Sequence, residues 1–174
     1  MTRNKLVSAL EGGDRRSIGR SDQVATLVRS NPRLFPHLMQ GLWSEDPLIR
    51  MRAADAAEKV TRNSPQLLAP YRKELLGLMA ESTQQELRWH LAVMVPRLPL
   101  NSRERRLAAS LLSDYGNDRS SIVRTFALQG LADLAKNDPG IQPAVIEILR
   151  EATRNGTPAM KARSRKLLRQ FQSE

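Results

Sequence analysis

The chain has 174 residues and no cysteine, and its 28 Lys and Arg against 18 Asp and Glu give a formal net charge of +10. The lack of cysteine excludes disulfides, thiolate metal sites and a cysteine nucleophile. Apolar residues make up 40% of the sequence but aromatic residues only 4%, which favours closely packed helices over a sandwich of strands. Neither a secretory signal nor an apolar run of about 20 residues is present, so we expect a cytoplasmic protein without a membrane partner.

The N-terminal region predicts an irregular pair of helices within residues 1–30. A short helix over Thr2–Leu10 ends at two glycines, and the loop GGDRRSIGR leads to a helix that Ser21 caps and whose apolar side is Val24, Leu27 and Val28. The loop has glycines and arginines, as phosphate-binding loops do, but its glycine spacing is not that of a P-loop and no strand precedes it. We expect Asp14, Arg15 and Arg16 to brace the first repeat, with a contact role as the alternative.

Beyond residue 30 the chain repeats itself. The segment DPLIRMRAADAAEKV at residues 46–60 has counterparts near residues 84, 120 and 157, and a helix is expected before each copy, at about 32–43, 65–80, 102–115 and 139–154. Repeats of this length are typical of stacked helix pairs. The predicted organisation is one domain over residues 1–174, with repeats at about 31–62, 64–98, 101–136 and 138–171.

An alignment of the four copies on one basic position shows a helical period. The basic residues are Arg50, Arg88, Arg124 and Lys161. Offsets of −1, +3, +7 and +10 from them hold Ile49, Leu87, Val123, Met160, Ala53, Leu91, Ala127, Ser164, Ala57, Val95, Leu131, Leu168, Val60, Leu98, Leu134 and Phe171, of which all but Ser164 are apolar. These offsets lie on one face of a helix, so this stripe is the predicted core. Within the second copy, Pro96 is expected to kink or end the helix.

DPLIRMRAADAAEKV and DRSSIVRTFALQGLADL resemble the HEAT repeats of the armadillo-like superfamily. The chain as a whole is also similar to small bacterial HEAT-repeat proteins with GGDRRSIG, RMRAADA and RWH segments. The resemblance implies an all-α fold, a right-handed α-solenoid of about five antiparallel helix pairs, and names no activity. It also implies that the aligned arginines are mainly structural, and the spacing of Asp118 and Arg124 fits an ion pair of this kind.

Two candidate binding surfaces follow from the outward face of the second helices, which lines the concave side of a HEAT solenoid. The leading hypothesis is a scaffold or adaptor that binds an acidic or mixed protein partner, and its surface residues are Met51, Arg52, Trp89, His90, Val93 and Arg97. A buried, purely structural Trp89 is the alternative for that patch. The second hypothesis is sequence-independent nucleic-acid binding, with phosphate contacts from Arg163, Arg165, Lys166 and Arg169. Lys161, which has no evident acidic partner in its repeat, is expected to face a ligand. A genomic bias toward arginine is another explanation of the basic charge.

Catalytic patterns are scarce. The only histidines, His37 and His90, lie in different repeats, and no HExxH, GxSxG or GxGxxG motif is present. Some HEAT-like proteins are DNA glycosylases, and Trp89, Asp55 and Arg88 are the residues that could act in such a site. We expect no enzyme activity, no metal and no cofactor, and the sequence gives no indication of the oligomeric state.

Overall fold

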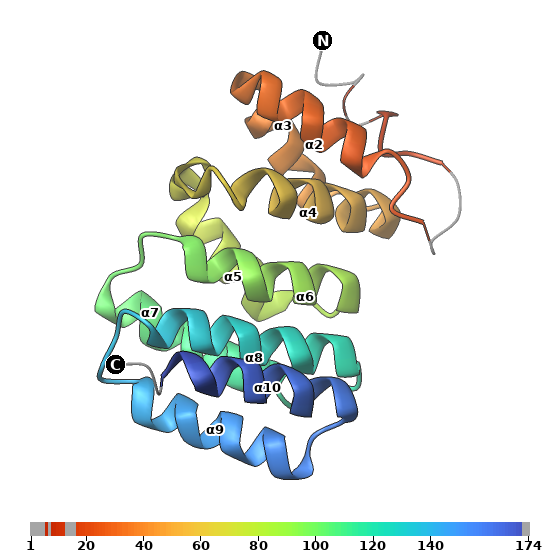
Figure 1. The fold of residues 1–174 in the computed structure, drawn as a ribbon. Coiled ribbons are helices and arrows are strands. Elements are labelled where there is room, and N and C mark those ends of the chain that lie inside the picture. Colours follow the sequence, from red (N-terminus) through yellow and green to blue (C-terminus); the bar gives the residue numbers. More distant parts are fainter. Residues whose placement is uncertain (1–5, 7, 13–16, 172–174) are drawn as a thin grey trace. The chain divides into compact units, whose positions relative to one another are not determined.

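The computed structural model describes Leu6, residues 8–12 and residues 17–171, and this part of the chain is helical without a strand (Figure 1). The all-α prediction is confirmed at this level. Most of the predicted first helix and residues Asp14, Arg15 and Arg16 of the loop lie outside the described residues. Contacts divide the chain into two compact units, Met1–Pro70 and Tyr71–Glu174, which we describe one at a time. The prediction of a single domain stays a prediction.

The first unit contains two α-helices of ten residues or more among its described residues. The elements are α2 (Ser21–Ser30), the 3₁₀ helix η1 (Pro32–Leu34), α3 (Phe35–Gln40), the 3₁₀ helix η2 (Gly41–Trp43), α4 (Pro47–Thr61) and the 3₁₀ helix η3 (Pro65–Tyr71), which ends just past the unit boundary. Helix α4 packs against α2, α3 and η2. Ser21 is the first residue of α2 and not its cap, because its hydroxyl donates a hydrogen bond of 2.5 Å to Asp55 of α4. The capping prediction is therefore wrong.

The second unit continues the alternation of helices. Its elements are α5 (Arg72–Glu81), α6 (Gln85–Met94), the 3₁₀ helix η4 (Val95–Arg97), α7 (Ser102–Tyr115), α8 (Ser121–Ala135), α9 (Gln142–Asn155) and α10 (Pro158–Gln170). The prediction for Pro96 is confirmed, since α6 ends at Met94 and the chain continues as η4. The helix expected at 65–80 is instead two elements, because Pro70 in η3 has no amide hydrogen to continue an α-helix.

Helix α8 is the centre of the second unit, packing against α6, α7, α9 and α10. Gly130 brings it close to α6: a Cβ atom there would lie 2.2 Å from the carbonyl oxygen of Ala92. A helix with neighbours on several sides buries more than one stripe. Accordingly Thr125 and Ala132 are buried as well as the aligned stripe.

The predicted core is confirmed by the burial of the aligned stripe. Of its 16 positions, 13 are buried, and only Met160, Leu168 and Phe171 at the C-terminal end are half-buried. Among the described residues, no helix is both long and apolar enough to cross a bilayer.

Candidate functional site

The outer face of α10 is strongly basic. Five of its 13 residues are Lys or Arg and none is Asp or Glu. Lys161, Arg165 and Arg169 are four residues apart, so they form a row along the helix with steps of about 6 Å, and Lys166 lies beside this row. The opposite side, with Ser164 and Leu167, is buried. We call this side, with the half-buried Lys161 and the exposed Arg165, Lys166 and Arg169, the α10 basic face.

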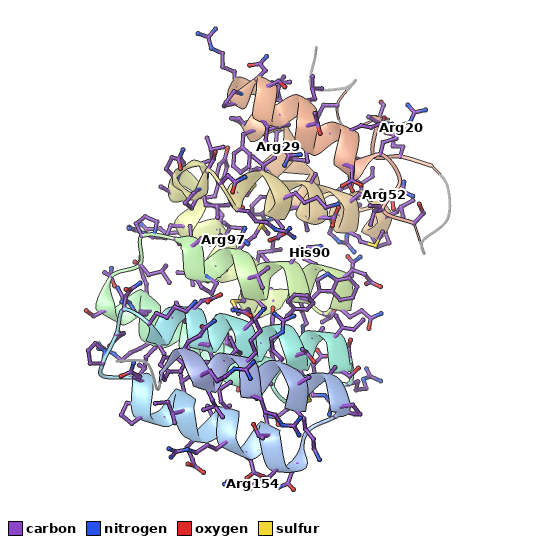
Figure 2. The ribbon with its side chains drawn as sticks, viewed as in Figure 1. Arg20, Arg29, Arg52, His90, Arg97 and Arg154 are labelled. Atoms are coloured by element: carbon purple, nitrogen blue, oxygen red, sulfur yellow. The ribbon has the colours of Figure 1, made fainter. Side chains whose placement is uncertain are left out.

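The cations of this face differ from those of the preceding helix. On α9, Arg154 contacts Glu147 at 3.0 Å and Glu151 at 2.9 Å, and Arg150 lies 3.6 Å from Glu147. Figure 2 labels Arg154 at the edge of the second unit. By contrast, the side chains of Lys161, Arg165 and Lys166 make no ion pair or hydrogen bond with any described residue. Their charge is therefore available to a ligand without first breaking an internal pair.

Arg163 is the exception among the predicted α10 contacts. Its guanidinium donates a hydrogen bond of 2.8 Å to Gln129 Oε1 and lies 5.8 Å from the centre of the Phe126 ring. Both partners belong to α8, so Arg163 ties α10 to its neighbour. A role in stability accounts for these contacts, and the predicted role in binding stays a prediction.

Arg52 is buried in the first unit, with 1% of its surface exposed. It donates hydrogen bonds to the backbone carbonyls of Leu10 at 2.8 Å, Ser17 at 3.2 Å and Gly12, and Figure 2 labels it beside the chain that leads into α2. Gly19, at φ +54°, leaves the space that the guanidinium occupies. The prediction that Arg52 lies on an exposed binding surface is wrong, because these carbonyls hold it inside the unit.

Met51 and His90 are also buried, at 8% exposure each, which corrects their placement on an exposed patch. Met51 is on α4, which is buried on most of its circumference. His90 receives a hydrogen bond of 3.3 Å from the indole of Trp89 at Nε2, and its Nδ1 lies 2.6 Å from the carbonyl oxygen of Glu86. A ring that carries its proton on Nδ1 satisfies both contacts. Trp89, Val93 and Arg97 are half-buried, so Trp89 is neither fully exposed nor fully buried.

The aligned arginines have different partners from those expected. Arg88, and not Arg124, forms the ion pair with Asp118, and the Arg88 guanidinium also lies 4.9 Å from the centre of the Tyr115 ring. Partial burial opposes ionisation of the Asp118 carboxyl, but the Ser120 amide and the Arg88 guanidinium outweigh it and hold its pKa below the usual value. The predicted pair of Asp118 with Arg124 is wrong.

The residues considered for a glycosylase site have structural partners. Asp55 accepts hydrogen bonds from Ser21 at 2.5 Å and from Lys59 at 2.6 Å within the first unit. Arg88 of the second unit donates to the Ser82 carbonyl at 2.6 Å as well as to Asp118. Within the part of the chain that the structure describes, no group of three His, Cys, Asp or Glu side chains could hold a metal ion.

Comparison with known proteins gives no relative from which a function could be transferred. No family model matches the chain, and neither a curated protein nor a solved structure matches it. The candidate site therefore depends on the arrangement of the side chains alone.

Proposed function

We propose that this chain is a HEAT-type α-solenoid that binds the phosphate backbone of nucleic acid without sequence preference and catalyses no reaction. The observation that carries the proposal is the α10 basic face, in which three cations have no partner among the residues that the structure describes. Alternating helices and the recurring buried stripe support the solenoid. To bind phosphates, the protein needs only positive charges placed along the nucleic-acid backbone, and it makes no contacts to the bases that would select a sequence.

The composition of the α10 basic face favours a polyanion over a folded protein partner. The other exposed residues of α10 are Pro158, Ala159, Ala162 and Gln170, and none of them is aromatic. The centres of protein interfaces are enriched in Trp, Tyr and Phe and depleted in Lys. The burial of Met51, Arg52 and His90 also removes half of the surface on which the protein-binding hypothesis depended.

The row of cations has a length suited to several phosphates. From Lys161 to Arg169 the helix rises about 12 Å, and each strand of duplex DNA carries one charge for about every 3.4 Å of the axis. Three or four phosphates can therefore lie against this face together. Binding by the three unpartnered cations predicts a plot of log K against log salt with a slope of about −2.7 on duplex DNA.

In the test, fluorescently labelled duplex and single-stranded DNA of unrelated sequences are titrated with the protein. Binding is measured by fluorescence anisotropy at several salt concentrations. The variant Lys161→Gln, Arg165→Gln, Lys166→Gln should lose most of the affinity and most of the slope. A matched control removes three exposed charges elsewhere in the second unit, by Lys73→Gln, Arg103→Gln and Arg106→Gln, and should retain both. Equal losses in the two variants would mean that net charge alone attracts DNA, and the proposal would fail.

An acidic protein partner would give a different result. The chain would then not bind DNA or RNA even at low salt. A partner protein would be recovered in a pull-down, and its binding would depend on Trp89 and Val93. Trp89→Ala is the variant that separates the two, since it leaves the α10 basic face unchanged.

A further inference from the structure

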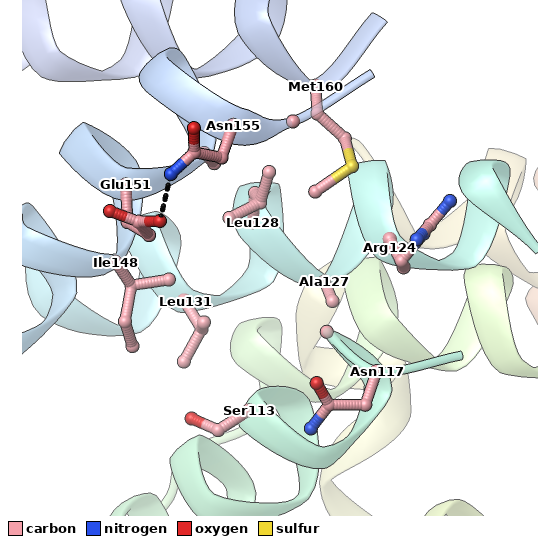
Figure 3. Close-up of a pocket in the computed structure, with 13 residues that line it drawn as sticks. Ser113, Asn117, Arg124, Ala127, Leu128, Leu131, Ile148, Glu151, Asn155 and Met160 are labelled. Atoms are coloured by element: carbon pink, nitrogen blue, oxygen red, sulfur yellow. Dashed lines mark hydrogen bonds between the residues drawn. The ribbon is translucent and has the colours of Figure 1, made fainter. Parts of the chain in front are cut away.

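A pocket of about 530 Å³ lies in the second unit between the end of α7, α8, the end of α9 and the start of α10 (Figure 3). Its size is in the range of small-molecule sites, about 300 to 1,000 Å³. The inner wall is aliphatic, with Ala127, Leu128 and Leu131 of α8, all of them buried. In Figure 3, Arg124 lies at one end of these residues and Glu151 at the other. The α10 basic face does not include this pocket.

Arg124 differs from the two arginines at the same position of the earlier copies, Arg50 and Arg88. Arg50 donates to the Ser44 carbonyl at 2.7 Å and Arg88 to the Ser82 carbonyl at 2.6 Å, in each case six residues back along the chain. Arg124 makes no hydrogen bond or ion pair with any described residue, and its Nε is buried without an acceptor. The carboxylate that stands six residues before it, Asp118, is bound by Arg88.

A buried donor without an acceptor is unfavourable, and in native structures such donors are few. Since Arg124 has no hydrogen bond to a described residue that must first break, its guanidinium can turn toward the pocket. A guanidinium binds a carboxylate through two parallel hydrogen bonds, and the aliphatic wall beside it favours an apolar chain. At the far end, Glu151 already binds Arg154 and Asn155, so this end presents a carboxylate and not a cation to a second negative group.

We propose that this pocket binds a monocarboxylate that carries an aliphatic chain, with the carboxylate at Arg124 and the chain against Leu128 and Leu131. The same chemistry is found in a free aliphatic acid and in a protein C-terminus that ends in leucine. Binding is independent of the α10 basic face, so the nucleic-acid proposal and this one can fail separately.

The test is calorimetric titration of the full chain with octanoate, hexanoate, octanol and suberate. Octanoate should bind more tightly than hexanoate by about fourfold per methylene buried. Octanol, which has no charge, and suberate, whose second carboxylate would meet Glu151, should both bind at least about tenfold more weakly. A tetrapeptide ending in leucine, with a free or an amidated carboxyl group, distinguishes the two sources, and binding of either the free acid or the free-carboxyl peptide supports the proposal.

Three variants complete the test. Arg124→Gln should weaken octanoate binding by about tenfold to a hundredfold and leave octanol binding unchanged, while the exposed control Arg106→Gln should alter neither. Ser113→Phe, at an exposed position of the pocket wall, should abolish both. The helical circular dichroism spectrum confirms that each variant folds. Octanoate binding that is undetectable, or equal in the wild type and Arg124→Gln, or matched by suberate, would overturn the proposal.

Discussion

Replacing Gly130 by alanine is expected to destabilise the second unit, although alanine is the better helix former. The new methyl group would lie 2.2 Å from the Ala92 carbonyl oxygen and 3.0 Å from the nearest atom of the Leu112 side chain. Since the nearest atom belongs to the backbone of α6, α6 and α8 must move apart. Overpacking of a core costs about 1 to 3 kcal/mol, and the upper part of this range is expected for a backbone clash. The higher helix propensity of alanine offsets about 1 kcal/mol of this cost. The free energy of unfolding should therefore fall by about 2 kcal/mol.

The same substitution at Gly77 provides the control. Gly77 is exposed on α5, and a Cβ atom there meets nothing within 4 Å, so Gly77→Ala should stabilise the unit by about 1 kcal/mol. Urea unfolding followed by circular dichroism measures both free energies, and an unchanged m-value shows that the midpoint shift is a change in stability. In a chain of this size, 1 kcal/mol corresponds to about 2 to 4 °C in Tm. If Gly130→Ala matched or exceeded the wild type in stability, the close approach of α6 and α8 would be refuted.

Three further predictions concern single side chains. Arg52→Met leaves three backbone carbonyls without their charged donor, so the free energy of unfolding should fall by about 2 to 4 kcal/mol in urea, and an unchanged value would contradict the buried placement of Arg52. Asp118→Asn should be less stable than the wild type at neutral pH. Because the folded-state pKa of Asp118 is lowered, the carboxylate stabilises the fold above its unfolded pKa of about 3.9 and ceases to do so as the pH falls through the folded value. The difference between the two proteins should therefore shrink below about pH 4, and a constant difference would argue against the ion pair. Tyr115→Phe removes a hydrogen bond of 2.7 Å to the Met79 carbonyl and should cost about 1 to 2 kcal/mol, whereas equal urea midpoints would show that this bond contributes nothing. Burial raises the pKa of Tyr115, so its tyrosinate absorbance should appear only above the pH at which free tyrosine ionises.

The core could be predicted because its signal is local. Positions such as Ile49, Ala53 and Ala57 recur at helical spacing, and one helix face suffices to bury them. Pro96 likewise acts on its own helix. In contrast, the burial of Met51 depends on how much of the circumference of α4 is covered, and no pattern within the helix records that.

The site was harder to predict because backbone groups leave no trace in the sequence. Arg52 binds backbone carbonyl oxygens, and every residue has one. The amino-acid sequence of the loop therefore does not show which carbonyls accept these hydrogen bonds. The useful signal was glycine, since Gly12 and Gly19 both have positive φ angles. The partner of Asp118 is Arg88, 30 residues away, and not Arg124, six residues away. Both arginines stand at the same position of their repeats, so spacing alone does not distinguish them.

The contact between Gly19 and Arg52 makes these two positions mutationally dependent on each other. A Cβ atom at residue 19 would lie 2.7 Å from Arg52 Cζ, so an alanine there displaces the guanidinium from its carbonyls as well as straining the backbone at φ +54°. In a chain that already lacks the guanidinium, only the backbone strain remains. The effects of the two substitutions are therefore less than additive, and during divergence a side chain at residue 19 becomes acceptable more readily after residue 52 has lost its arginine than before.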